Sequence, residues 1–281
     1  MPEYAGRSDF WNIGYPLAGA LVYLVAPVAL AAIVYALRRR WRMWHTAGAD
    51  PDLGPASERW KAFLAFAAAG LLAHRQFVRK RDLYPGIMHL AIFWGFGILL
   101  IATTIAALEF NAEKYLNWTW PTVHARIPLG FTWDVFGGGL AALGLTMALW
   151  RRYVIRPGRL NTMLDDGVVL VFLFTILISG FLIEALRIGA TELNPASIYY
   201  DTSVAGWSPI GWVVAKALIG IGFTFTALET LHAVAWWLHA GIFLGAIVYA
   251  AARFSRLTHM IVSPMNWYYR NLRSRGALKP M

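Results

Sequence analysis

The chain has 281 residues, of which 58% are hydrophobic and 14% are charged, and its mean hydropathy is +0.51. This composition departs from that of a soluble globular domain and predicts a protein that is embedded in a lipid membrane. The absence of cysteine excludes a disulfide, a cysteine-ligated iron–sulfur cluster and a thioether-linked c-type haem within these residues. The net charge of +10 does not indicate a nucleic-acid partner, because the basic residues flank apolar runs and form no separate basic domain.

Five apolar runs are long enough to cross a membrane, which requires about 20 predominantly apolar residues for roughly 30 Å of hydrocarbon. The first run ends on three consecutive arginines from Arg38, and the fifth is bracketed by Glu229 and Arg253. We therefore expect an all-α integral membrane protein, a five-transmembrane-helix bundle that forms a single domain over residues 1–281. The expected spans are residues 12–37, 83–108, 130–150, 167–187 and 229–252.

Two further apolar segments are expected to lie at the membrane surface. Residues 62–73 are too short to span and run into a basic stretch, a pattern that is typical of an interfacial helix. Residues 209–228 are rich in glycine, contain Lys216 and connect to the fifth run without a loop that could return across the membrane. We expect an outer surface helix there.

The distribution of charge predicts the orientation, because cytoplasmic flanks carry an excess of Lys and Arg. With the N-terminus outside, the segments 38–82, 151–166 and 253–281 hold 20 of the 25 basic residues and only 6 of the 15 acidic ones. A sixth span would put the first basic loop and the basic tail on opposite faces. We expect a multi-pass protein of the inner (cytoplasmic) membrane with a cytoplasmic tail over residues 253–281. No cleavable signal peptide is expected, since residues 1–10 lack a basic start.

Two histidines at matching depth indicate a cofactor, because an ionisable side chain inside the bilayer is costly and marks a functional site. His89 lies seven residues after Asp82, and His259 lies seven residues after Ala252, so both are expected near the cytoplasmic face. Two neutral imidazoles from different helices can hold the iron of haem b. We expect His89 and His259 to ligate one such haem.

The fifth run carries two more histidines. His232 and His239 are seven residues apart, which places them about 20° from one helical face and roughly 10 Å apart, so they cannot ligate one iron. His239 and His259 are roughly 30 Å apart along a continuous helix, so two haems are geometrically compatible. For His232, ligation and a hydrogen bond to a neighbouring helix are equal alternatives. His124, in the loop before the third run, is another residue that could cap a site on the outer face.

Three motifs carry a family resemblance. They are Pro85-Gly-Ile-Met-His89-Leu-Ala-Ile-Phe-Trp-Gly95-Phe, Trp236-Trp-Leu-His239 and Phe254-Ser-Arg-Leu-Thr-His259. The chain resembles the cytochrome b family of respiratory nitrate reductase gamma subunits over nearly its whole length. Its tail from Ser263 resembles more closely the haem b domains of heterodisulfide-reductase-like proteins and of electron-transfer-flavoprotein:menaquinone oxidoreductases. In that branch such a tail often leads into a cytoplasmic iron–sulfur domain, so the resemblance implies a separate iron–sulfur subunit as the partner.

The resemblance implies two stacked b haems and a quinone site. His89 and His259 match the ligands of the haem nearer the cytoplasm, and His239 matches a ligand of the distal haem. The sequence departs from the family at Leu99, where a second histidine would stand. The 20 residues from His239 to His259 also rotate by about 200°, which requires a kink or an unwound helix end before His259. The missing distal ligand would come from His124, which we prefer, or from His232.

The implied function is that of a b-haem membrane anchor subunit, which transfers electrons between a cytoplasmic iron–sulfur partner and menaquinone or ubiquinone. We expect the tail, with Arg270 and Arg273, to dock that partner. For the quinone site, the outer half offers Lys216, Glu229 and His232, and the last two are neighbours on one helical turn. Two alternatives are the cytochrome b anchor of a hydrogenase or formate dehydrogenase, and a cofactor-free transporter or assembly subunit whose histidines relay protons or bind a metal.

Overall fold

The computed structural model describes residues 11–46, 53–72, 83–118, 129–158, 160–253 and 259–270. Within these ranges the chain is helical and contains no β-strand. Five of the helices are long and apolar enough to cross a membrane, which confirms the predicted number of spans by length and composition. Their apolar segments are Pro16–Met43, Leu83–Leu116, Leu129–Ile155, Leu164–Ala190 and Phe225–Tyr249.

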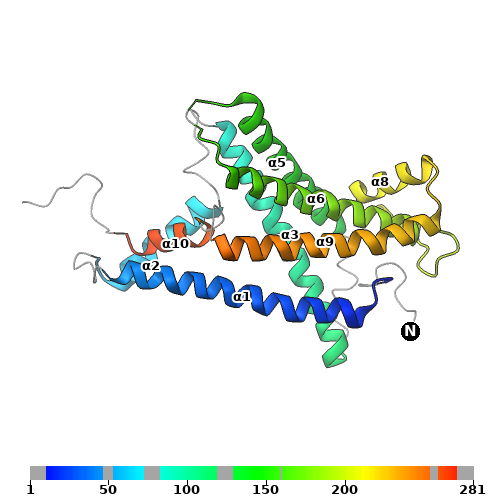
Figure 1. The fold of residues 1–281 in the computed structure, drawn as a ribbon, viewed down its shortest axis with the longest axis horizontal. Coiled ribbons are helices and arrows are strands. Elements are labelled where there is room, and N and C mark those ends of the chain that lie inside the picture. Colours follow the sequence, from blue (N-terminus) through cyan, green and yellow to red (C-terminus); the bar gives the residue numbers. More distant parts are fainter. Residues whose placement is uncertain are drawn as a thin grey trace, which may run out of the picture. The chain divides into compact units, whose positions relative to one another are not determined.

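The chain divides into two compact units, which we describe separately. Unit 1 comprises Met1–Val25 and Ile87–Ala246, and unit 2 comprises Ala26–Gly86 and Ile247–Met281. Three long helices contribute residues to both units. They are α1 (Tyr15–His45), α3 (Leu83–Leu116) and α9 (Phe225–Arg253) (Figure 1).

In unit 1 the third span is a helix of mixed type. It contains the π-helix η3 (Thr132–Gly139), the α-helix α5 (Leu140–Trp150) and the π-helix η4 (Arg151–Ile155). Short π segments inside α-helices are rare and often accompany functional sites. Here η3 carries three consecutive glycines, and a Cβ on Gly138 would clash with the ring of Phe181. The glycines therefore let neighbouring side chains approach the backbone of this span.

Helices α3 and α5 approach each other closely at two glycines. A Cβ on Gly95 would lie 2.5 Å from the backbone nitrogen of Ala141, and one on Gly144 would lie 2.7 Å from that of Ile92. Small residues at such crossings allow the backbones of membrane helices to touch. Leu99 packs beside this contact against a buried cluster formed by Ala141, Leu145 and, from α6, Leu177. It is the position at which the nitrate reductase gamma family has a second histidine.

Helix α8 (Pro209–Gly220) packs against the second half of α6 (Leu164–Ala190), as Figure 1 shows. A Cβ on Gly211 would lie 2.9 Å from the side chain of Glu184. The first turn of α8 is capped from η3, because the backbone N–H of Ile210 donates to a carboxylate oxygen of Asp134 at 2.5 Å. Asp134 is buried. Helix α8 therefore contacts two other elements of unit 1, α6 and η3.

The structure corrects the predicted surface helix over residues 209–228. Helix α8 ends at Gly220, and α9 already begins at Phe225. Gly222 lies between them with φ +100°, a backbone conformation that side chains with a Cβ rarely adopt. The last residues of the predicted helix therefore form the first turn of the fifth span, and the chain reverses at the glycine.

In unit 2 the predicted interfacial helix begins earlier than expected. It consists of α2 (Ala56–Phe66), which continues as the π-helix η1 (Ala67–Leu72). Helix α10 (His259–Tyr268) packs against α2, with Phe66 and Trp267 stacked at 4.4 Å between ring centroids. Helix α9 ends at Arg253 and α10 begins at His259, and the kink or unwound end expected before His259 lies outside the described residues.

Candidate functional site

His239 lies in the middle of α9, where this helix contacts α6 in unit 1. Its Nδ1 is 2.8 Å from the hydroxyl oxygen of Ser179. That hydroxyl donates its own proton to the backbone carbonyls of Thr175 at 2.6 Å and Ile176 at 3.1 Å. When the single hydroxyl proton is donated to one of these carbonyls, the serine oxygen accepts from the N–H at Nδ1 of His239, and the lone pair of the neutral ring is on Nε2.

This arrangement is the one that a metal-binding histidine usually has. Such a histidine donates its second ring N–H to a nearby oxygen, which fixes the tautomer and the orientation of the ring. Beside the imidazole, a Cβ on Gly180 would lie 3.7 Å from Cε1 of His239, which is an ordinary contact distance. The α6–α9 contact thus presents a half-buried imidazole whose Nε2 has a lone pair for a ligand when Nδ1 donates to Ser179.

His232, two turns earlier on α9, is buried, with 4% of its surface exposed. Its Nδ1 is 2.6 Å from the side-chain oxygen of Asn12, whose amide nitrogen donates to the backbone carbonyl of Glu229 at 2.8 Å. The amide of Asn12 is oriented by that second bond, so His232 donates from Nδ1. The hydrogen bond of His232 is made to a residue of the turn that precedes α1, not to a neighbouring helix, and Nε2 of His232 carries the lone pair.

A buried ion pair lies at the same end of unit 1. Arg187, in the last turn of α6, contacts Glu192 at 2.5 Å, and their side chains are 15% and 0% exposed. The adjacent Leu186 packs with Leu228 of α9, one turn before His232. Charges this deeply buried in a membrane protein are costly unless they are paired, and they mark a functional region.

The two histidines predicted to share a haem belong to different units. His89 is half-buried on α3, and it lies on the same side of that helix as Phe96, which packs against the α5–α6 core. His259 is the first residue of α10 and is exposed. Their pairing stays a prediction. His124, the preferred distal ligand, lies outside the described residues.

The three residues predicted to line a quinone site are placed separately by the structure. Lys216 Nζ lies 3.9 Å from the ring centroid of Trp212 on its own helix, a cation–π contact. The side chain of Glu229 is exposed, and it is the backbone carbonyl of this residue that contacts Asn12. His232 is buried on the next turn. A quinone site among them stays a prediction.

Two curated proteins are similar to this chain. An "EtfAB:quinone oxidoreductase" of Syntrophomonas wolfei is 28% identical over 258 residues, which cover 90% of this chain and 34% of that protein. A "Probable iron-sulfur-binding oxidoreductase FadF" of Bacillus subtilis is 24% identical over 270 residues, which cover 95% of this chain and 35% of that protein. The chain thus spans about a third of the length of the curated relatives it matches. No protein-family model and no solved structure match it.

Proposed function

We propose that the chain is the membrane-spanning, haem-b-binding part of a quinone-linked electron-transfer oxidoreductase. The names of both relatives describe oxidoreductases, one acting with quinone and one binding iron–sulfur. The five apolar helices and the intramembrane histidines support a membrane role. Because the 281 residues contain no cysteine, the iron–sulfur centres of such an enzyme would lie outside them, in a heterodisulfide-reductase-like partner that meets the cytoplasmic face.

The observation that carries the proposal is the hydrogen bond between Ser179 and His239. It holds the imidazole with its lone pair on Nε2, the form in which histidine ligates haem iron. A bound haem b would supply a one-electron carrier inside the bilayer. His239 would provide one axial ligand, and Ser179 would orient it. The second ligand would be His124 or His232.

A second haem near the cytoplasmic face would take His89 and His259, the pair that the sequence predicts. Their neutral imidazoles, on separate helices, would hold the iron of this haem. The tail beyond α10, with its arginines, would lie beside the partner that exchanges electrons with this haem. The chain itself would conduct electrons and would not recognise the soluble substrate.

The haem content of purified variants tests the proposal. His239→Ala should lose one haem per chain in a pyridine haemochrome assay, because the ligating nitrogen is removed. His45→Ala is the matched control, since His45 is an exposed histidine whose Nδ1 contacts the backbone carbonyl of Trp41 at 2.9 Å. A wild-type protein that shows no b-type spectrum after reduction, or a His239→Ala variant with full haem content, would contradict the proposal.

A further inference from the structure

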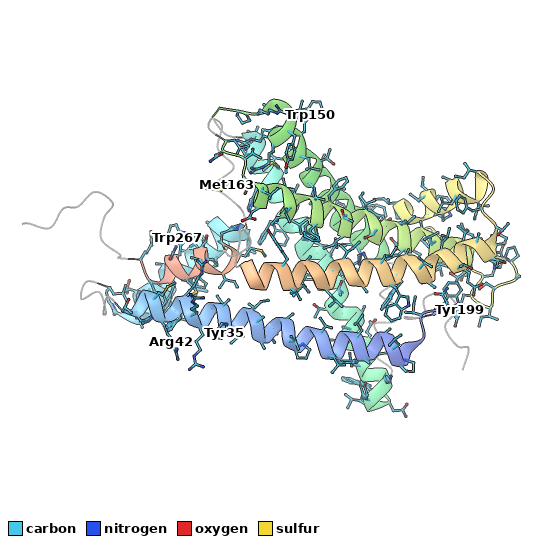
Figure 2. All side chains as sticks on the ribbon, viewed as in Figure 1. Tyr35, Arg42, Trp150, Met163, Tyr199 and Trp267 are labelled. Carbon is cyan, nitrogen blue, oxygen red and sulfur yellow. The ribbon has the colours of Figure 1, made fainter. Side chains whose placement is uncertain are left out.

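A groove of about 740 Å³ runs along the first half of α6 in unit 1. Figure 2 labels Met163, which stands at the start of this helix where the groove begins. The lining comes from η4, from the residues that precede α6, from α6 itself and from one residue of α9, Ile242. Between Gly167 and Thr175 the groove follows α6 for roughly 12 Å, at about 1.5 Å per residue.

One end of the groove is built around the hydroxyl of Tyr153. A Cβ on Gly167 would lie 2.5 Å from that oxygen, so the hydroxyl lies against the backbone of the glycine. The neighbouring Arg152 and Asp166 form an ion pair at 2.8 Å with side chains 17% and 6% exposed, which joins η4 to the start of α6. Asp166 also accepts the backbone N–H of Met163 at 3.0 Å. Tyr153 follows Arg152 in η4, and it is 41% exposed.

The lining has the chemistry of a site for an elongated apolar molecule with hydrogen-bond acceptors at one end. The hydroxyls of Tyr153 and Thr162 lie at the η4 end, while Val168, Val171 and Phe172 make the remainder apolar. No charged side chain is among the lining residues that the structure describes. A phospholipid phosphate would require a cation, and the nearby Arg152 is already paired with Asp166. A quinone ring needs only donors for its two carbonyls, and an isoprenoid tail needs an apolar channel.

The groove also ends beside the candidate haem ligand. Ile242 follows His239 by three residues on α9, which is less than one helical turn. Thr175, at the same end, provides a backbone carbonyl that accepts from Ser179. Glu184, which α8 contacts, is 17 residues beyond Gly167 and nine beyond Thr175, so it lies roughly 25 Å along α6 from the glycine and roughly 14 Å from the other end of the groove.

We propose that this groove is the quinone-binding site, with the ring at the end where the Tyr153 hydroxyl lies and the isoprenoid tail along α6 toward Ile242. The proposal rests on the quinone-linked function proposed above and assigns the quinone to a site within the chain. The Tyr153 hydroxyl donates a hydrogen bond to a ring carbonyl, and the missing Cβ of Gly167 lets this hydroxyl lie against the helix backbone. The ring then lies at the end of the third and fourth spans, and the tail extends toward the membrane interior.

Photolabelling of the purified full chain with an azido-substituted quinone tests this assignment. The labelled peptides of the wild type should fall within residues 151–175 and should be protected by an excess of a menaquinone analogue. Gly167→Ala should weaken protection by at least about tenfold, because the new Cβ displaces the Tyr153 hydroxyl. Tyr153→Phe should weaken it roughly threefold to tenfold through the loss of one hydrogen bond. Gly158→Ala is the matched control, since a Cβ there meets no atom within 4 Å.

Label on residues 209–232, or protection in Gly167→Ala equal to that of the wild type, would overturn the groove assignment. So would label in the groove that a phospholipid removes and the menaquinone analogue does not. The haem spectrum of the same sample separates the two proposals. A sample with haem and with quinone label elsewhere contradicts only the groove, whereas a sample with neither haem nor protected label contradicts the proposed function as well.

Discussion

Ser179 on α6 and His239 on α9 are 60 residues apart in the sequence, and their side chains are joined by a hydrogen bond of 2.8 Å. If His239 ligates haem, Ser179→Ala should lower haem affinity about 10-fold to 100-fold, the usual effect of removing the group that orients a ligating histidine. Haem titration of the apoprotein measures this. Gly180→Ala, beside the same imidazole, should leave the affinity unchanged, and equal effects in both variants would contradict the orienting role of Ser179.

The pairing of His89 and His259 is tested by replacing each of them with alanine. Each variant should lose the same haem, because an iron that lacks one axial ligand is held weakly. Reduction from an iron–sulfur partner should fail in both variants, while any haem at His239 should keep its spectrum. Haem quantification and stopped-flow reduction provide the two measurements. Variants that lose different haems, or none, would show that the two histidines do not form a pair.

Removal of one partner of the buried Arg187–Glu192 pair should be strongly destabilising. Glu192→Gln leaves the arginine charge without its carboxylate, and such a loss typically costs about 3–5 kcal/mol. The exposed pair of Lys61 and Glu58, at 3.3 Å, provides a control, because Glu58→Gln should cost less than about 1 kcal/mol. Denaturant unfolding in detergent measures both variants. Similar losses of unfolding free energy in Glu192→Gln and Glu58→Gln would indicate that the Arg187–Glu192 pair is open to water.

The close approach of α3 and α5 predicts a large difference between two glycines of one helix. Gly95→Ala places a Cβ 2.5 Å from the backbone of Ala141 and should destabilise unit 1 by about 1–3 kcal/mol. Gly97→Ala meets no atom within 4 Å and should be neutral or slightly stabilising, since alanine favours helix. Thermal unfolding of the two variants measures the difference. Equal melting temperatures would contradict the backbone contact.

The outer quinone site predicted from the sequence is tested by Glu229→Gln. With the quinone in the α6 groove, this variant should exchange electrons with quinone analogues at the wild-type rate. Quinol oxidation kinetics with an artificial acceptor measure it, and Tyr153→Phe in the same assay should be slower. A slow Glu229→Gln variant beside a normal Tyr153→Phe variant would favour the outer site.

The sequence was sufficient to predict the number of spanning helices, because length and apolar composition are properties of continuous segments. It was insufficient for the partners of the histidines. Asn12 and His232 are 220 residues apart in the sequence, and a single sequence does not show that their side chains lie close together in the structure. Ser179 could have been noticed as a polar residue within an apolar run, but its partner depends on the rotation of α6 against α9.

The end of the surface helix was misjudged for a different reason. Apolar residues continue through the segment from Pro209 into the fifth span, so hydropathy alone gives no boundary. The reversal depends on the positive φ of Gly222, and other glycines of the same segment, such as Gly220, are equally permissive. Which glycine turns the chain is decided by the packing of α8 on α6.

The glycine contacts between α3 and α5 also have a consequence for biogenesis. The spans that contain them are apolar enough to insert, and the two helices meet backbone to backbone at glycines. In a two-stage scheme of membrane protein folding, inserted helices associate laterally through such contacts. This pair can therefore associate soon after insertion, before α6 and α9 enclose His239. Cofactor loading would then be a late step that acts on a preassembled scaffold.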